Sequence, residues 1–241
     1  MYQKIKGYLV PAFCVVEAIL LSLILFTGFY TTYVCFSVII TCFLATFIFI
    51  KDAKFNFLVS IALLFTVISD FFLVVLFSYH PHEFFQSLAV TTFSVTQLCY
   101  FAYLIVNTSG SQIQRHITIR IIACVVAIVL PIFILQDSAN YLALITMFYF
   151  ANLLVSTAYA FRNYKKSPLF AIGLLFFVLC DIFVGMKMGH GVFFNIPENS
   201  FWYKLFFCDF NFMWLFYTIS QTLIVLSLKY NKLEKEPLMT E

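Results

Sequence analysis

The chain alternates long apolar runs with short polar interruptions. Eight of these runs approach the roughly 20 apolar residues that an α-helix needs to cross a bilayer. They cover about 8–28, 31–50, 55–77, 84–106, 117–135, 140–161, 168–188 and 208–228. Because the runs take up nearly the whole sequence, the pattern predicts an all-α membrane protein. We expect eight transmembrane helices in a single polytopic domain over residues 1–241, with no separate soluble domain.

The composition agrees with this membrane assignment. Hydrophobic residues make up 63% of the 241 positions and charged residues only 10%. So few charged groups cannot cover a soluble globule of this size. The formal net charge of +3 does not indicate nucleic-acid binding, because the placement of the basic residues follows from membrane topology.

Lysine and arginine gather at alternate ends of the predicted helices. If the N-terminus is cytoplasmic, twelve of the fourteen basic residues lie on the cytoplasmic side, as the positive-inside rule requires. These twelve are Lys4, Lys6, Lys51, Lys54, Arg115, Arg120, Arg162, Lys165, Lys166, Lys229, Lys232 and Lys235. An even number of helices then places both termini in the cytoplasm. The membrane is expected to be that of the endoplasmic reticulum or another cellular membrane.

Two segments of the chain match each other at a constant offset. Residues 60–75 read SIALLFTVISDFFLVV and residues 171–186 read AIGLLFFVLCDIFVGM, with Asp70 and Asp181 at the same position. The helices that follow carry similar segments, FSVTQ ending at Gln97 and YTISQ ending at Gln221. The sequence therefore predicts a tandem parallel repeat of four plus four helices, with halves at about 1–110 and 111–241.

The repeated aspartates are the strongest candidates for chemistry. An Asp at the centre of a membrane helix costs about 2.5 to 3.5 kcal/mol on insertion scales, so its side chain should face the protein interior. If Asp70 and Asp181 meet in one internal cavity, with their helices packed together, one carboxyl should hold a proton near neutral pH. The pair would then supply an acid and a base.

A structural role is the alternative for these polar residues. Intramembrane aspartates can instead hydrogen-bond across helices, here to Gln97, Gln221, Tyr217 or Asn152. Glu17 in the first helix has no counterpart in the second half, and it fits either a cavity wall or a structural contact.

Other reactive motifs are weak. The seven cysteines lack CxxC or zinc spacing. His80, His82 and Glu83 lie together in a predicted outer loop, but their spacing does not match a metal site. No serine-hydrolase elbow, P-loop or dinucleotide motif occurs. The sequence therefore predicts neither a metal nor a cofactor.

Several stretches resemble the lysoplasmalogenase-like (YhhN-type) family of membrane proteins. They are the two aspartate repeats, TFSVTQLCYF, NYLALITMFYFANLLVSTAYAFR and FYTISQTLIVLS, which together cover the third to eighth predicted helices. The resemblance implies an eight-helix bundle that hydrolyses the vinyl ether bond of lysoplasmalogens. The products are a fatty aldehyde and glycerophosphoethanolamine or glycerophosphocholine.

The resemblance also implies roles for individual residues. Asp70 and Asp181 would be the catalytic acid and base. The candidate substrate-binding residues are Gln97, Tyr217, Gln221, Glu17 and Asn152. The family usually has Gly and Ser before the two aspartates and often His in the fourth helix, where this chain has Ser69, Cys180 and Gln97.

The expected partners are a lysophospholipid substrate and membrane lipids, with no nucleic acid, and the sequence indicates no particular oligomeric state. The competing function is a small-molecule or lipid transporter, in which the aspartates of the parallel repeat bind protons or a cationic headgroup. A catalytically inactive lipid-binding relative is the other alternative.

Overall fold

The computed structural model describes residues 2–27, 32–50, 56–106, 110–136, 139–191 and 194–230. The eight predicted membrane helices are confirmed: within these residues, eight helical segments are long and apolar enough to cross a bilayer. Seven are single α-helices: α1 (Tyr2–Phe26), α2 (Thr32–Phe49), α5 (Glu83–Val106), α6 (Gly110–Leu135), α7 (Tyr141–Arg162), α8 (Pro168–Gly189) and α10 (Phe212–Tyr230). The third span joins α3 (Phe57–Asp70), the π-helix η1 (Phe71–Leu76) and α4 (Phe77–Tyr79).

The loop before the last span contains a helix that the apolar pattern did not predict. The short helix α9 (Phe201–Phe206) begins where Ser200 Oγ accepts a hydrogen bond from the backbone N–H of Tyr203 at 3.1 Å. The last span begins at Phe212 rather than near residue 208, because Asn211 Oδ1 accepts from the Trp214 N–H and marks a new helix start. The apolar pattern of the sequence alone does not reveal such N-terminal helix caps.

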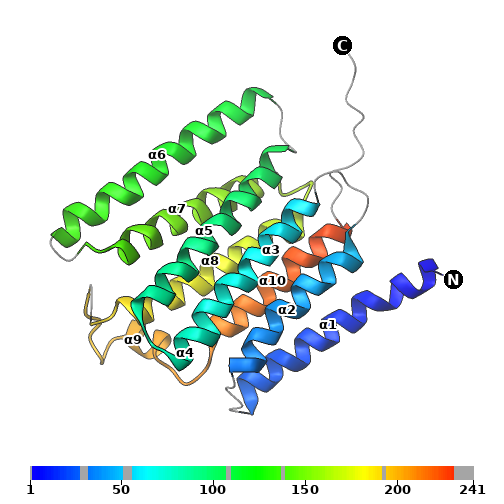
Figure 1. Ribbon diagram of the computed structural model, residues 1–241, viewed down its shortest axis with the longest axis horizontal. Helices are drawn as coiled ribbons and strands as arrows, with labels where there is room; N and C mark the ends of the chain where they lie inside the picture. Colours follow the sequence, from blue (N-terminus) through cyan, green and yellow to red (C-terminus); the bar gives the residue numbers. More distant parts are fainter. Residues whose placement is uncertain are drawn as a thin grey trace.

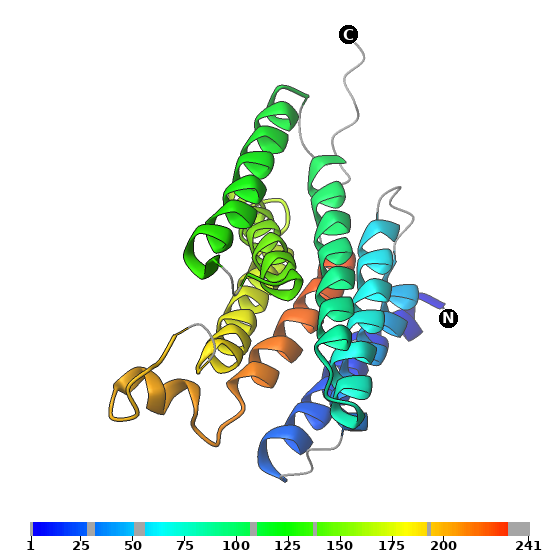
Figure 2. The ribbon, with the colours of Figure 1, turned by 60° about the vertical axis from the view of Figure 1, so that its left-hand side comes forward.

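The helices form two layers (Figures 1 and 2). In one layer α3 packs between α2 and α5, and in the other α8 packs between α7 and α10. The layers join where α2 meets α10 and where α5 meets α7. At the two edges, α1 packs on α2 and α10, whereas α6 packs on α7. The aspartate helices α3 and α8 thus lie in opposite layers and pack mainly against other helices, so the expected direct packing of these two helices is not observed.

Small residues bring the helices of each layer close together. Thr96 Oγ1 on α5 donates to the backbone carbonyl of Ala62 on α3 at 3.2 Å. At the corresponding position on α8, a Cβ on Gly173 would lie 3.1 Å from the Ser220 carbonyl oxygen of α10. Close backbone approach at small residues is a common way to join helices in membranes, where apolar surface offers no preference for protein over lipid.

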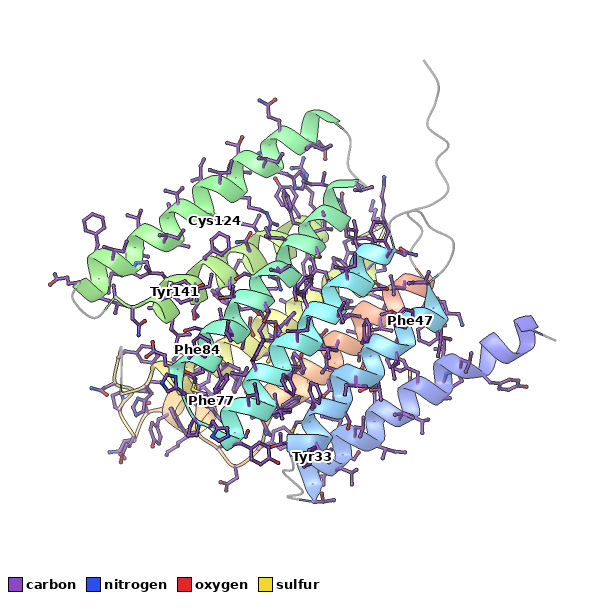
Figure 3. All side chains as sticks on the ribbon, viewed as in Figure 1. Tyr33, Phe47, Phe77, Phe84, Cys124 and Tyr141 are labelled. Carbon is purple, nitrogen blue, oxygen red and sulfur yellow. The ribbon has the colours of Figure 1, made fainter. Side chains whose placement is uncertain are left out.

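Exposed aromatic residues mark both ends of the bundle. One end carries Tyr33, Tyr79, Tyr141 and Trp202, and the other carries Tyr8, Tyr164 and Tyr230. Figure 3 shows Tyr33 and Phe84 at one end and Phe47 toward the opposite end. Tyrosine and tryptophan favour the two membrane interfaces because their rings combine an apolar body with a polar group. The two groups therefore indicate where the bundle leaves the hydrocarbon.

Part of the predicted charge pattern lies outside the described residues, namely Lys51, Lys54, Lys232 and Lys235.

The α8–α10 contact provides a test of the packing. We expect Gly173→Ala to lower the unfolding temperature in detergent, since the added methyl would meet the Ser220 carbonyl oxygen at 3.1 Å and the Ile224 backbone nitrogen at 3.2 Å. Overpacking of this kind costs about 1 to 3 kcal/mol, or several degrees for a chain of this size. Gly185→Ala is the matched control on the same helix, because its Cβ would meet nothing within 4 Å. Equal unfolding temperatures for the two variants would contradict the close contact.

Candidate functional site

Asp70 lies where the third membrane span changes its helical form. The α3 helix ends at this residue and the π-helix η1 starts at Phe71. By contrast, α8 continues as a regular α-helix through Asp181. Short π-helical segments occur often at functional sites, because the wider turn changes the direction in which neighbouring side chains point. The amino-acid pattern around Asp70 gave no signal for this change.

The Asp70 carboxyl is buried and held by one tyrosine. Asp70 is 2% exposed, and its Oδ2 accepts a hydrogen bond from the Tyr217 hydroxyl of α10. Tyr217 is the only hydrogen-bond donor to this carboxyl within the described part of the chain, which leaves Oδ1 without a donor there. The neighbouring Ser69 hydroxyl instead bonds to Thr92 Oγ1 on α5 at 2.6 Å.

Asp181 has the same kind of partner, from a different helix. Its Oδ2 accepts from the Tyr149 hydroxyl of α7 at 2.5 Å, and the side chain is partly exposed. The residue of the first half that corresponds to Tyr217 is Phe93, which has no hydroxyl to donate. A tyrosine on a neighbouring helix therefore holds Asp181, and the two aspartates have unlike surroundings.

Two phenylalanine rings connect the Asp70–Tyr217 and Asp181–Tyr149 pairs. Phe177 contacts the Tyr217 ring at 5.9 Å between ring centres and Phe93 at 6.0 Å. Phe93 in turn contacts the Tyr149 ring at 5.7 Å. These ring contacts link the two aspartate–tyrosine pairs, although the aspartates lie on helices of opposite layers.

A model of the YhhN family matches residues 12–228 of the chain. The chain belongs to the YhhN family. This is the family of lysoplasmalogenase-like proteins, and the match takes in all eight spans at least in part. No curated protein matches the chain, and no solved structure does.

Two glutamines of this YhhN-family chain are deeply buried without partners. Gln97 on α5 and Gln221 on α10 are both fully buried, and neither amide has a hydrogen-bond partner among the described residues. A buried amide without a partner costs about 1 to 3 kcal/mol. Such groups in a membrane interior are ready to bind water or a polar ligand.

The other two candidate binding residues lie apart from the aspartates. Glu17 on α1 accepts hydrogen bonds from Thr41 and from Cys42 of α2, where it links these two helices. Asn152 on α7 accepts from Arg120 of α6 and donates to the Phe148 carbonyl. Neither residue hydrogen-bonds an aspartate.

Sequence reasoning missed two residues of this interior. Tyr149 lies three residues before Asn152, in a stretch that carried the family resemblance. It was not singled out because it lies outside the segments that repeat in the two halves of the sequence. Arg120 was considered only as one of the basic residues on the predicted cytoplasmic side, and nothing in the sequence indicated that its side chain is buried against α7.

The surface hollows found in the described residues do not reach the carboxyls. One runs along α1 near Ile19, and the other lies at the turn that follows α7. Neither is lined by Asp70 or Asp181, so the expected cavity shared by the two carboxyls is not among them.

The unequal burial of the aspartates generates a stability prediction. Tyr217→Phe leaves a fully buried carboxyl without its donor and should cost about 1 to 3 kcal/mol. Tyr149→Phe should cost less, because the Asp181 carboxyl that it leaves without a donor is only partly buried. Thermal unfolding of the purified variants in detergent measures the difference.

Tyr159→Phe is the control for that experiment, since the Tyr159 hydroxyl has no partner among the described residues. If Tyr217→Phe lowers the unfolding temperature no more than Tyr159→Phe does, the hydrogen bond to Asp70 is contradicted.

Proposed function

We propose that this protein is a membrane hydrolase that cleaves the vinyl ether bond of lysoplasmalogens. The products are a fatty aldehyde and glycerophosphoethanolamine or glycerophosphocholine. The observation that carries the proposal is the pair of interior aspartates, each bonded to one tyrosine, in a chain of the lysoplasmalogenase-like family.

Vinyl ether hydrolysis needs proton transfers that two carboxyls can perform. A carboxylic acid protonates the β carbon of the double bond, which creates an oxocarbenium ion at the α carbon. Water adds to that carbon as a base accepts its proton, which gives a hemiacetal. The hemiacetal hydroxyl then loses its proton as the bond to the glycerol oxygen breaks, and that oxygen takes up a proton, which releases the aldehyde and the glycerophospho alcohol. Positioned acids and bases typically accelerate such steps by 10² to 10⁴.

Asp70 and Asp181 take these two roles in the proposal. The protonated aspartate donates to carbon, while the ionised one stabilises the cation and accepts the proton from water. Each carboxyl keeps its Oδ1 free of donors among the described residues, since the tyrosines bind Oδ2. The unpartnered amides of Gln97 and Gln221 orient the water or the glycerol hydroxyl. The surrounding phenylalanines hold the hydrocarbon chain.

The same proposal includes a tandem parallel repeat of four plus four spans. Helix packing supports it: the contacts α1–α2, α2–α3 and α3–α5 recur as α6–α7, α7–α8 and α8–α10. The contacts between halves also correspond, since α5–α7 matches α10–α2. Ala62 and Gly173, which are equivalent in the repeat, each lie in close contact with the following span of their half.

Both termini are proposed to be cytoplasmic, in the endoplasmic reticulum or another cellular membrane. Reporter tags inserted after Lys6 and after Lys235 should therefore give the same cytosolic signal in intact cells. Signals from opposite sides of the membrane would contradict the eight-span topology. A luminal signal from both tags would indicate the opposite orientation.

The catalytic roles are tested by isosteric substitution. Asp70→Asn and Asp181→Asn keep the size of the side chain but abolish its titration. Each should lower the rate of aldehyde release from lysoplasmalogen by at least about 10²-fold, because a general acid or base is lost. The rate is measured on purified protein in detergent, after comparing the amounts of folded protein.

Asp209→Asn is the matched control, since Asp209 is exposed in the loop before α10. Its rate should equal that of the wild type. Wild-type turnover in both Asp70→Asn and Asp181→Asn would contradict the proposed acid–base mechanism. Failure of the wild-type protein to release aldehyde would favour the transporter or an inactive lipid-binding relative.

A further inference from the structure

Arg120 is a charged residue buried among neutral groups in the membrane region. It lies on α6 and is 5% exposed. Its Nη1 donates to Asn152 Oδ1 at 2.7 Å and its Nη2 to Ser156 Oγ at 2.8 Å, both on α7. The guanidinium also lies over the Phe101 ring of α5, 3.8 Å from the ring centre. These contacts solvate the charge without neutralising it.

A purely structural arginine does not account well for this arrangement. Charged side chains buried in the protein interior are normally paired with an opposite charge or coordinate a ligand. Among the described residues, the hydrogen-bond partners of Arg120 are neutral and do not compensate its positive charge. The ligand that this charge favours is an anion.

The guanidinium also has hydrogen bonds to offer. It carries five N–H donors, of which Asn152 and Ser156 take one each. Nε has no partner among the described residues. A planar fork of donors suits a phosphate, which it binds through two parallel hydrogen bonds. Arg120 therefore retains the donors that phosphate recognition requires.

His116 adds further donor capacity beside Arg120. It precedes Arg120 by one helical turn on α6, is almost completely buried, and neither of its ring nitrogens has a partner within the described ranges. Buried polar nitrogens of this kind need a hydrogen-bond partner, and an anion bound at Arg120 would lie close to them.

One face of α7 leads from Arg120 to the candidate catalytic site. Tyr149, Asn152 and Ser156 are spaced three and four residues apart, which places them on the same side of the helix. Tyr149 holds Asp181, while the other two hold Arg120. From the helical rise, Asn152 and Ser156 lie roughly 5 and 10 Å along the axis from Tyr149. A glycerol unit between an ether oxygen and a phosphate spans a comparable length.

We infer that Arg120, assisted by His116, binds the phosphate of the lysophospholipid substrate. The polar face of α7 then holds the glycerol unit and directs the vinyl ether toward Asp181. The identity of the substrate rests on the proposed function, whereas the phosphate site rests on the surroundings of Arg120. On this inference, Asn152 assists substrate binding by holding Arg120. It therefore acts near the phosphate of the headgroup and not at the reacting carbon.

The test compares two substrates that differ only in the phosphate. Wild-type protein should have a lower KM for alkenyl glycerophosphoethanolamine than for alkenyl glycerol. Arg120→Gln should raise the first KM roughly tenfold to hundredfold, the range for a lost hydrogen bond to a charged group, and leave the second unchanged. Arg120→Lys keeps the charge but loses the planar set of donors. Its KM for alkenyl glycerophosphoethanolamine should therefore lie between those of the wild type and Arg120→Gln. A merely structural arginine would affect both substrates equally.

Arg115→Gln is the matched control, because Arg115 is an exposed arginine five residues earlier on α6. It should keep the wild-type preference for the phosphate-bearing substrate. An unchanged preference in folded Arg120→Gln or Arg120→Lys would overturn the phosphate site.

A binding measurement separates this inference from the proposed hydrolysis. Alkyl glycerophosphocholine has a saturated ether that cannot be cleaved by this route, and alkyl glycerol is its counterpart without phosphate. Binding of the first lipid that is stronger than that of the second and depends on Arg120 supports the site, even if no aldehyde is ever released. Binding that does not depend on Arg120 contradicts it. Displacement of the lipid by an equal concentration of inorganic phosphate would assign the site to a soluble anion and overturn the lipid assignment.

Discussion

The interior of this protein must accommodate carboxyls within a bundle of membrane-spanning helices. Asp70 is 2% exposed, so the hydrogen bond to its carboxyl comes from the protein itself. The Tyr217 hydroxyl supplies it across the two layers, from α10 to α3. This bond fixes the relative position of the layers near the middle of the bundle. The phenylalanine contacts from Phe177 to Tyr149 extend the same region to Asp181.

The number of membrane helices could be predicted because hydrocarbon imposes a length and a composition on every span. Some details that depend on individual hydrogen bonds escaped prediction. Asn211 starts the last helix later than the apolar run suggests, and Ser200 starts a short helix in a loop. The π-helix after Asp70 is a change of backbone form that apolar periodicity does not encode.

The site was predicted in part, for a comparable reason. A repeated charged residue is visible against an apolar background, which is how Asp70 and Asp181 could be found. The sequence did not single out Tyr149, because tyrosine is common in this chain. Only the structure shows which tyrosine hydroxyl donates to Asp181. Arg120 was counted only among the cytoplasmic charges, because the positive-inside rule counts basic residues without considering whether their side chains are buried.

The substitution of phenylalanine for tyrosine at position 93, relative to position 217, breaks the symmetry of the repeat. Two identical carboxyls in identical surroundings would exchange a shared proton with no preferred location. Here one carboxyl is sealed and the other is partly open, and their tyrosines come from different helices. In the proposed mechanism, this asymmetry would give the transferred proton a defined starting point and a defined destination.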